Sequence, residues 1–499
     1  MARPPHARRM GVIVQSGRCH DVRAPGEPRR LSHVGRAARR REDPPLLRGE
    51  GRFLDDLPID GVAHVAFVRS AHAHARLVAL DVAVARKAAG VIAVVTAAEV
   101  DAFPAIGMAR AIEGMVVPEM AFVAGDVVRC QGTPVAIVVA ESAELAHDAA
   151  ALVRAEWTAL PGAAEPDAAL AVYVEPSGLG WESGLVRMET DGRVTVATGS
   201  SAHGQGHETV FAQIVADRLG IEPEAIDVRH GDTAAIATGI GTFGSRSTAL
   251  GGGALVHAAD AVVVKARRLA AHLLEAHAAD VRLGAGGFAV AGVPDRFVRW
   301  ADVARLAWAG PLPPGEEPGL EASHVLAPEH EVWSGGAVVA AVRIERETGA
   351  LTLERLVWID DAGTIVNPLL ADGQLDGSLA QAWGQIALEA VRFDAEGHML
   401  SGTLMDYALP RADDVPHAEI HHMHSPTKRN PLGAKGLGEA GNIGVPPAVV
   451  NAVLDALSPF GVRHLDMPLT PESIWRAIRG TENAPAKPGK VELESRCRA

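Results

Sequence analysis

Three glycine-rich loops contain the residues of this sequence whose types and spacing suit chemistry. The first loop holds Gly204, Gln205 and Gly206 and opens a segment with apolar residues at helical spacing. Glycines let backbone N–H groups approach a ligand closely, and a helix N-terminus favours an anion such as a phosphate. An amide placed between two glycines can both donate and accept hydrogen bonds. This loop alone does not separate a binding loop from a plain strand-to-helix turn.

The second loop, "GIGTFGSRSTALGGG", repeats the arrangement of small residues before a helix. Arg246 offers a planar fork suited to phosphate, and Ser245 and Ser247 add hydroxyl donors. The alternative is a surface turn whose arginine is solvated. Because the loop-then-helix pattern occurs twice, we favour an anion site here.

The third loop places Glu439 among five glycines between Gly433 and Gly444, and a segment of helical character, "PPAVVNAVLDAL", follows. A carboxylate in such a loop can reach a ligand and act as a general base. Spacing alone favours the simpler alternative, in which Glu439 caps the helix or pairs with Lys435.

The bulk composition excludes several classes of protein. A net charge of -14 argues against nucleic acid or an anionic membrane as the main partner. The apolar runs are too short to span a bilayer, and no apolar stretch follows the N-terminal arginines as in a secretory signal. Cys19, Cys130 and Cys497 are scattered and form neither a disulfide framework nor a metal motif. We therefore expect a cytoplasmic protein without an iron–sulfur cluster of its own.

The chain divides into four stretches and has an α+β composition. Residues 1–40 show no periodicity and are expected to be a disordered arm or a misassigned start of translation, and residues 483–499 a solvated tail. Residues 41–163 alternate strands with helical stretches, one after the strand in "GVIAVVTAAEV" and one at 141–157, and predict a compact unit. Residues 164–482 predict a larger unit of strands, glycine-rich loops and helices, with a hairpin around Arg346–Ala350.

Taken in order, these segments are similar to the molybdopterin-binding large subunit of the molybdenum hydroxylases. This is the family of xanthine dehydrogenase, aldehyde oxidase and aerobic carbon monoxide dehydrogenase, and the last branch is the nearest. The resemblance is carried by "GRFLDDLPIDGVAHVAFVRSAHAHARL", "GQGHETVFAQIVADRLG", "GIGTFGSRSTALGGG" and "RNPLGAKGLGEAGNIGVPPAVVNAVLDAL". It implies an N-terminal a/b hammerhead domain over residues 41–163 and a C-terminal molybdopterin-binding domain over residues 164–482.

The resemblance also implies a role for each matching residue. Glu439 falls at the family's catalytic base, which removes a proton from a metal-bound hydroxyl group. No side chain is implied as a ligand of the metal itself. Three groups match the segments that bind the pterin with its nucleotide tail, that hold the dinucleotide, and that lie beside the molybdenum: first Gly204, Gln205, Gly206, His207 and Thr209, then Gly244, Ser245, Arg246 and Ser247, and finally Lys435, Gly436 and Gly438.

The implied cofactor is molybdenum–molybdopterin cytosine dinucleotide. The implied activity is that of an oxidoreductase that oxidises an aldehyde, an N-heterocycle or a similar small substrate with oxygen from water. Electrons would leave through a [2Fe-2S] small subunit to a FAD-binding medium subunit, both of them separate chains. The family also allows the large subunit to form a homodimer.

The sequence departs from the family pattern at one large site. Family members carry a further domain with a "GGGFGGK"-type motif before the segment that matches "YVEPSGLGWES", and the motif does not occur in this sequence. That domain supplies half of the cofactor cage and the substrate loop. We therefore expect a shortened chain that binds little molybdenum. Two alternatives stay open: a non-catalytic truncated subunit that only associates with family partners, and a nucleotide-binding module without molybdenum.

Overall fold

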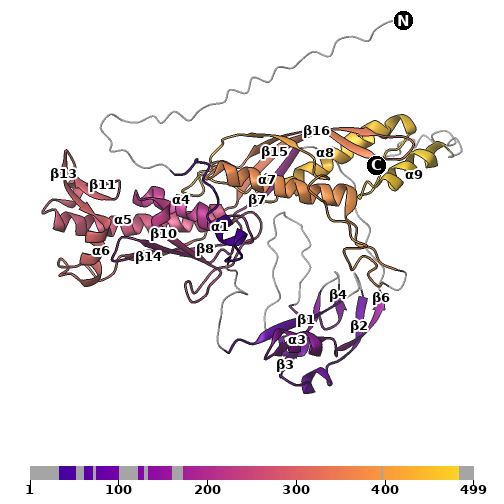
Figure 1. The fold of residues 1–499 in the computed structure, drawn as a ribbon, viewed down its shortest axis with the longest axis horizontal. Coiled ribbons are helices and arrows are strands. Elements are labelled where there is room, and N and C mark those ends of the chain that lie inside the picture. The colour runs from indigo at the N-terminus through magenta and orange to yellow at the C-terminus, as the bar shows by residue number, and fades with distance from the viewer. Residues whose placement is uncertain are drawn as a thin grey trace, which may run out of the picture.

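The computed structural model describes residues 33–51, 61–70, 75–100, 122–128, 133–159, 172–394 and 397–482. Most of the predicted N-terminal arm, the predicted tail at 483–499 and the predicted domain boundary at residue 163 lie outside these ranges. Figure 1 shows a body built from two halves, with a smaller unit from the N-terminal part of the chain beside it.

The smaller unit contains two three-stranded sheets with strand orders β1-β5-β3 and β4-β2-β6. Helix α3 packs on the first sheet and begins at Ser142, whose side chain accepts a hydrogen bond from the N–H of Leu145. The helix predicted over 141–157 is too long, because residues 154–159 form a strand that pairs with β2. The elements are β1 (His64–Arg69), β2 (Ala75–Asp81), β3 (Val91–Thr96), α2 (Ala97–Val100), β4 (Val127–Val128), β5 (Pro134–Ala140), α3 (Ala143–Ala150) and β6 (Arg154–Ala159).

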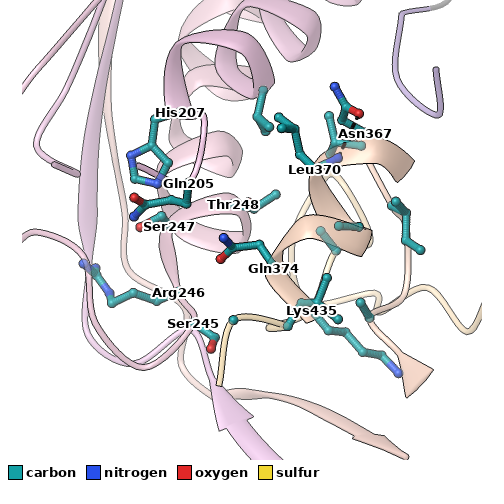
Figure 2. Close-up of a pocket in the computed structure, with 18 of the residues that line it drawn as sticks. Gln205, His207, Ser245, Arg246, Ser247, Thr248, Asn367, Leu370, Gln374 and Lys435 are labelled. Carbon is teal, nitrogen blue, oxygen red and sulfur yellow. Dashed lines mark hydrogen bonds between the residues drawn. The ribbon is translucent and has the colours of Figure 1, made fainter. Parts of the chain in front are cut away.

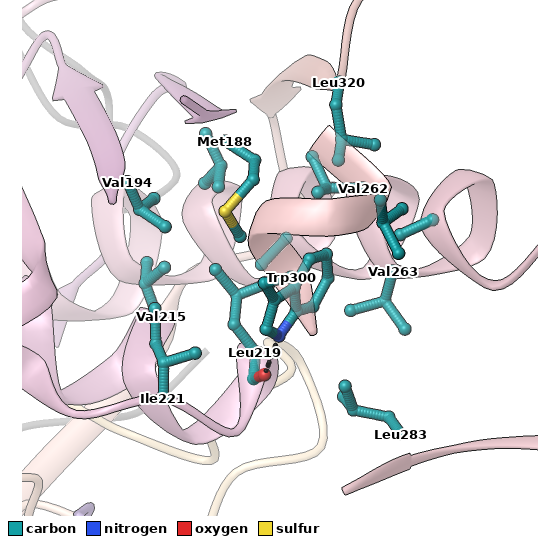
Figure 3. Packing of buried hydrophobic residues seen from close by; sticks show 14 of the residues in the cluster. Met188, Val194, Val215, Leu219, Ile221, Val262, Val263, Leu283, Trp300 and Leu320 are labelled. Carbon is teal, nitrogen blue, oxygen red and sulfur yellow. Dashed lines mark hydrogen bonds between the residues drawn. The ribbon is translucent and has the colours of Figure 1, made fainter. Parts of the chain in front are cut away.

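The first half of the body is a mixed sheet of order β10-β9-β8-β14, and helix α5 packs on β8 and β14. Its core is apolar, and Trp300 is held there by a 2.9 Å hydrogen bond from its indole Nε1 to the carbonyl of Leu219 (Figure 3). A small sheet, β11-β12-β13, and helix α6 extend this half. The elements are β8 (Glu182–Met188), β9 (Val194–Thr198), α4 (His207–Leu219), β10 (Ile226–His230), α5 (Gly253–Leu273), β11 (Val281–Gly284), β12 (Gly287–Val290), β13 (Val293–Arg299), α6 (Trp300–Ala309) and β14 (Glu321–Leu326).

The second half is a sheet of order β17-β16-β15-β7, with α7 and α8 packed together and α8 on the sheet. The predicted hairpin is confirmed: β15 and β16 pair antiparallel, and Gly349 in the connecting turn has a φ of 75°. The elements are β7 (Val172–Ser177), β15 (Val332–Ile344), β16 (Leu351–Asp361), α7 (Pro368–Trp383), β17 (Ala418–His422), α8 (Ala440–Leu457) and α9 (Pro471–Glu482). Helix α8 starts earlier than predicted, so Pro446 and Pro447 lie inside it.

Residues 33–51, with the short helix α1 (Asp43–Leu47), lie against α4 in the first half of the body. The N–H groups of His33 and Val34 donate to Asp217, and the side chain of Gln213 donates to the carbonyl of His33 at 2.7 Å. The prediction of a disordered arm is therefore wrong for residues 33–40. Their polar backbone groups find partners about 180 positions later in the sequence, which local patterns do not reveal.

Two helical stretches, residues 247–273 and 440–460, are long and apolar enough to cross a membrane. In the first stretch, 72% of the most apolar segment is buried inside the protein. In the second stretch, 39% of the corresponding segment is buried. The first stretch includes α5, which packs on α4, α6, β8 and β14. Apolar core helices meet the same criterion, so the two stretches are weak evidence for a membrane.

Candidate functional site

A cavity lies between the two halves of the body and brings all three glycine-rich loops together (Figure 2). One wall comes from the residues around Gln205 and from the start of the helical stretch that opens at Ser247. The other wall comes from the segment before α7, from α7 itself and from the loop before α8. The lining residues include Gln205, His207, Thr242, Ser245, Arg246, Ser247, Thr248, Thr364, Asn367, Leu370, Gln374, Lys435, Leu437 and Gly438.

A second hollow shares Gln205, Leu370 and Gln374 with this cavity and is also lined by Arg39 and Arg40. The two hollows measure about 140 Å³ and about 570 Å³. Ligand pockets for small molecules and cofactors usually measure roughly 300–1,000 Å³. The first hollow alone is therefore too small for a dinucleotide-sized cofactor, whereas the second hollow falls within this range.

The first loop turns sharply into α4 and presents two side chains to the cavity. Gly206 has a φ of 78°, and a Cβ there would lie 2.8 Å from the side chain of Leu370. Gln205 and His207 both line the cavity. Burial, with a smaller contribution from neighbouring His230, lowers the pKa of His207 to about 3, so its imidazole is neutral near pH 7. Its Nδ1 is buried without a hydrogen-bond partner, which suits a ligand group.

The N-terminus of α4 is already occupied by an anionic group of the chain. Glu42 accepts hydrogen bonds from the N–H of Glu208 at 2.9 Å and from the hydroxyl of Thr209 at 2.8 Å. The same hydroxyl accepts a bond from the N–H of Arg41. Thr209 is buried and does not line the cavity, so its predicted contact with the cofactor is wrong. The carboxylate of Glu42 fills the place that the sequence suggested for a phosphate.

The second loop corrects the prediction for Arg246. Its guanidinium is fully buried and points away from the cavity (Figure 2), with an ion pair to Glu182 at 3.0 Å. It also donates to the carbonyls of Leu179, Trp181 and Gly241. These partners take up its donors, so Arg246 fixes the loop instead of holding a phosphate. Only the part of Arg246 near the backbone lines the cavity.

The other small residues of the second loop do face the cleft. Ser245 and Ser247 line the cavity, and the hydroxyl of Ser247 lies 2.8 Å from that of Thr242. A π-helical turn, Ser247–Gly252, leads directly into α5. The first N–H groups of a helix lack intrahelical acceptors, so the residues that open this stretch bring hydrogen-bond donors to the cleft. Gly244 precedes them with a φ of 55° and does not line the cavity.

The third loop packs tightly against the second. A Cβ on Gly436 would lie 2.7 Å from the Cβ of Ser245, so only glycine permits this approach. Gly438 lines the cavity, as does Lys435, whose ammonium forms a 2.8 Å ion pair with Asp361. The two predicted cations, Arg246 and Lys435, are thus both neutralised by carboxylates of the chain.

Glu439 follows Gly438, which lines the cavity, and lies beside Ser245, but it is not itself a lining residue. The N–H of Glu439 donates to the hydroxyl oxygen of Ser245 at 3.1 Å, and that hydroxyl lies 3.3 Å from Glu439 Oε2. The side chain of Glu439 is exposed. The simpler alternative supposed an ion pair between Glu439 and Lys435, but Lys435 pairs with Asp361 instead. Glu439 does occupy the position just before α8, but its side chain makes no capping hydrogen bond.

Sequence reasoning missed the wall formed by α7. Asn367 caps this helix and ties it to the first half, because its side-chain amide donates to Gln213 at 2.8 Å. Gln374, about two turns further along, lines both hollows with a partly buried amide. The signal for the cap was present as Asn-Pro before an apolar stretch. Nothing local, however, indicated that this helix faces the first loop.

Residues 155–416, more than half of the chain, match the family model described as the molybdopterin cofactor-binding domain. The chain belongs to this family. Residues 48–161 match a second model of the same proteins, the aldehyde oxidase and xanthine dehydrogenase a/b hammerhead domain. The chain therefore belongs to the family of the molybdenum hydroxylase large subunits and has the α+β fold that the sequence predicted.

Individual relatives give the same picture. The chain is 40% identical over 299 residues to the carbon monoxide dehydrogenase large chain of Hydrogenophaga pseudoflava, a match that covers 60% of this chain and 37% of the relative. It is 37% identical over 301 residues to the nicotine 6-hydroxylase large subunit of Paenarthrobacter nicotinovorans, with the same two coverages. The chain thus spans well under half the length of these curated relatives.

The fold is shared with solved structures of the same kind. Quinoline 2-oxidoreductase from Pseudomonas putida 86 superposes with a TM-score of 0.74 and 23% identity, covering 91% of this chain and 99% of that chain. A copper- and molybdenum-containing CO dehydrogenase gives a TM-score of 0.74 at 20% identity. At these identities the likeness concerns the fold alone.

Proposed function

We propose that this chain is the molybdopterin-binding part of a hydroxylase that oxidises a small organic or one-carbon substrate with oxygen derived from water. The observation that carries the proposal is the cavity where the three glycine-rich loops of the family-matching region converge. Relatives are named for carbon monoxide, nicotine and hypoxanthine, so the family alone does not select a substrate. An aldehyde or an N-heterocycle is the class we put first.

The cofactor that we propose is molybdenum–molybdopterin cytosine dinucleotide. When bound, it supplies a metal centre that accepts two electrons from the substrate. The cavity fits the hydrogen-bonding part of such a group: Gln205 offers an amide, His207 a neutral ring nitrogen without a partner, and Ser247 a hydroxyl. The fit is weaker for the phosphates, because Arg246 and Lys435 are paired within the described part of the chain. Backbone N–H groups at the start of the helical stretch from Ser247 would have to bind them.

Glu439 is the proposed general base. Ser245 holds it beside the cavity through the Glu439 N–H and Oε2, so its carboxylate accepts a proton without large rearrangement. The rest of the exposed carboxylate stays available to the reacting group. The electrons must then leave the chain, and we propose the FAD-binding and [2Fe-2S] subunits as separate partners, with a cytoplasmic location.

A second candidate is a non-catalytic chain that only associates with family partners. The absence of a GGGFGGK motif from the sequence favours it. Bound cofactor distinguishes the two. Acid release of the nucleotide from chain purified from a molybdopterin-producing host, with its partner chains present, should yield cytidine monophosphate under the first proposal and no nucleotide under the second.

Glu439→Gln tests the catalytic part of the proposal. In the assembly that turns over, this variant should lower kcat by at least about two orders of magnitude, the usual scale for loss of a general base, and should leave bound molybdenum unchanged. Glu345→Gln, at an exposed glutamate in the hairpin turn, is the matched control. Unchanged turnover of the Glu439→Gln variant would exclude Glu439 as the base.

A further inference from the structure

Glu175 is a buried carboxyl group that neither the loops nor the family resemblance singled out. It lies on β7 opposite Ser334 of β15, and its side chain is 2% exposed. The hydroxyl of Ser334 donates to Glu175 Oε2 at 3.3 Å, whereas Oε1 is buried without a hydrogen bond of ordinary geometry. A buried carboxylate oxygen without a donor is costly, and a proton on that oxygen removes the cost.

The second and third loops meet β7 close to Glu175. A Cβ on Gly436 would lie 2.6 Å from the Cβ of Ser177, two positions after Glu175, and 2.7 Å from the Cβ of Ser245. Ser245 in turn is hydrogen-bonded to Glu439, which brings that carboxylate to the same place. The third loop is held against β7, because the N–H of Gly436 donates to the hydroxyl of Ser177 at 2.9 Å. Ser245 has a φ of 50°, a left-handed conformation that non-glycine residues rarely adopt. Strain of this kind persists where the surrounding contacts fix one geometry, and it is common at functional sites.

Two neighbouring carboxyl groups without a cation between them tend to share one proton. The cationic side chains of the two loops cannot neutralise this pair, since Arg246 is bound to Glu182 and Lys435 to Asp361. Burial, and less strongly the charge of Glu439, raise the pKa of Glu175 to about 7, although a hydrogen bond from Ser245 acts to lower it. The hydrogen bond from the hydroxyl of Ser334 also lowers the pKa of Glu175.

We propose that Glu175 is a positioning residue whose protonated carboxyl group donates a hydrogen bond to the carboxylate of Glu439. Its O–H and the hydroxyl of Ser245 together fix the direction in which Glu439 faces the cavity. The role of this pair in catalysis rests on the proposed function, whereas the sharing of one proton between the two carboxyl groups does not depend on it. A purely structural role, in which Glu175 only pairs with Ser334 inside the sheet, is the competing explanation.

Infrared spectroscopy of the full chain without cofactor tests the shared proton. The C=O band of a protonated carboxylic acid is assigned to Glu175 by its loss in Glu175→Gln, and its intensity is followed with pH. We expect a midpoint near 7 in the unaltered chain. Glu439→Gln should lower the midpoint because it removes the neighbouring charge, and Ser334→Ala should raise it because it removes a donor.

Glu419→Gln, at an exposed carboxylate on β17, is the matched control and should leave the midpoint unchanged. A Glu175 band that titrates with the ordinary carboxyl groups, or a midpoint that Glu439→Gln does not move, overturns the proposal. Glu439 is exposed, so its replacement does not threaten the fold. These results do not depend on bound metal.

Turnover in the complete assembly tests the positioning role. Glu175→Gln keeps an N–H donor and should retain kcat within about threefold, whereas Glu175→Ala should lower kcat by about tenfold or more with little change in KM. The unaltered assembly should lose activity as pH rises through about 7, where Glu175 loses its proton, and Glu175→Gln should not. Equal kcat values for the Gln and Ala variants overturn the positioning role. If Glu439→Gln leaves turnover unchanged, Glu439 is not the general base. The infrared result still shows whether Glu175 and Glu439 share a proton.

Discussion

At the scale of single residues, the cavity is surrounded by charges that the chain neutralises itself. Arg246 and Glu182 form a fully buried ion pair, and three carbonyl oxygens bind the same guanidinium. Taking two charges out of water is costly, and only a complete set of partners offsets the cost. The pair therefore holds the second loop in the single shape that presents its serines to the cleft.

Arg246→Ala should lower the free energy of unfolding by about 3–5 kcal/mol, because it leaves the carboxylate of Glu182 buried and unpaired. Urea unfolding followed by circular dichroism measures this loss. Arg229→Ala, which removes an exposed ion pair with Asp227, is the control and should cost less than about 1 kcal/mol. If Arg246→Ala leaves stability unchanged but weakens binding of cytidine diphosphate by calorimetry, the phosphate role predicted from the sequence is restored.

His207 makes stability depend on pH. Its pKa is about 3 in the folded chain and about 6.5 when unfolded, so between these values only the unfolded chain binds the proton. The free energy of unfolding should therefore fall as pH falls from about 6.5 towards 3, by at most about 5 kcal/mol. His207→Gln removes this contribution. The difference in the free energy of unfolding between the unaltered chain and this variant, measured by urea unfolding, should therefore change between pH 6.5 and pH 3. A difference independent of pH would show that His207 titrates normally.

At the scale of elements, the segment of residues 33–51 completes α4. Glu42 caps the helix, and Arg41 donates to the carbonyl of Ile226 at 2.9 Å. Arg40 donates to the carbonyl of Gly204 in the first loop. Because this segment also lines the second hollow, it links the shape of the cleft to a stretch far away in the sequence.

Glu42→Ala should destabilise the chain by about 1–2 kcal/mol, since it removes an acceptor and a negative charge from the N-terminus of α4. Hydrogen exchange should localise the loss to the first turn of that helix. Glu50→Ala, at an exposed partner of Arg48, should change stability by less than about 0.5 kcal/mol. Equal effects of the two substitutions would mean that Glu42 is a surface charge of no special value.

Local patterns predicted the elements well and their partners poorly. The hairpin at Arg346–Ala350 and the loop-to-helix turns follow from glycine positions and periodicity, and all are confirmed. The three loops were expected to share a site, and they do line one cavity. The errors at Arg246 and Thr209 have one cause: their partners are set by packing between distant segments. The importance of a buried carboxyl at Glu175 was hidden for the same reason.

At the scale of the whole molecule, the sheet of the second half has one covered and one open face. Helix α8 covers the side of Tyr173 and Val338, against which Gly444 packs closely. The register places the alternate residues on the opposite face, where several large apolar side chains are exposed. They are Val172, Val174, Trp333, Val339 and Ile359, with exposed fractions of 37–66%.

The open face includes β7, an edge strand of this sheet. Contiguous apolar surface of this kind usually marks an interface. We predict that the chain by itself self-associates and retains much less than one molybdenum per chain, because preorganised and water-excluding sites need walls on all sides. Replacing Val174 and Val339 by Thr, which keeps the β-branched shape, should raise the monomer fraction in light scattering. Val264→Thr, on the exposed side of α5, is the control and should not change the monomer fraction.

The molybdenum content is measured by mass spectrometry on the isolated chain from a cofactor-producing host, beside an assay of aldehyde oxidation. Near-stoichiometric molybdenum with turnover in that preparation would show that the walls supplied by this chain suffice and would contradict the prediction.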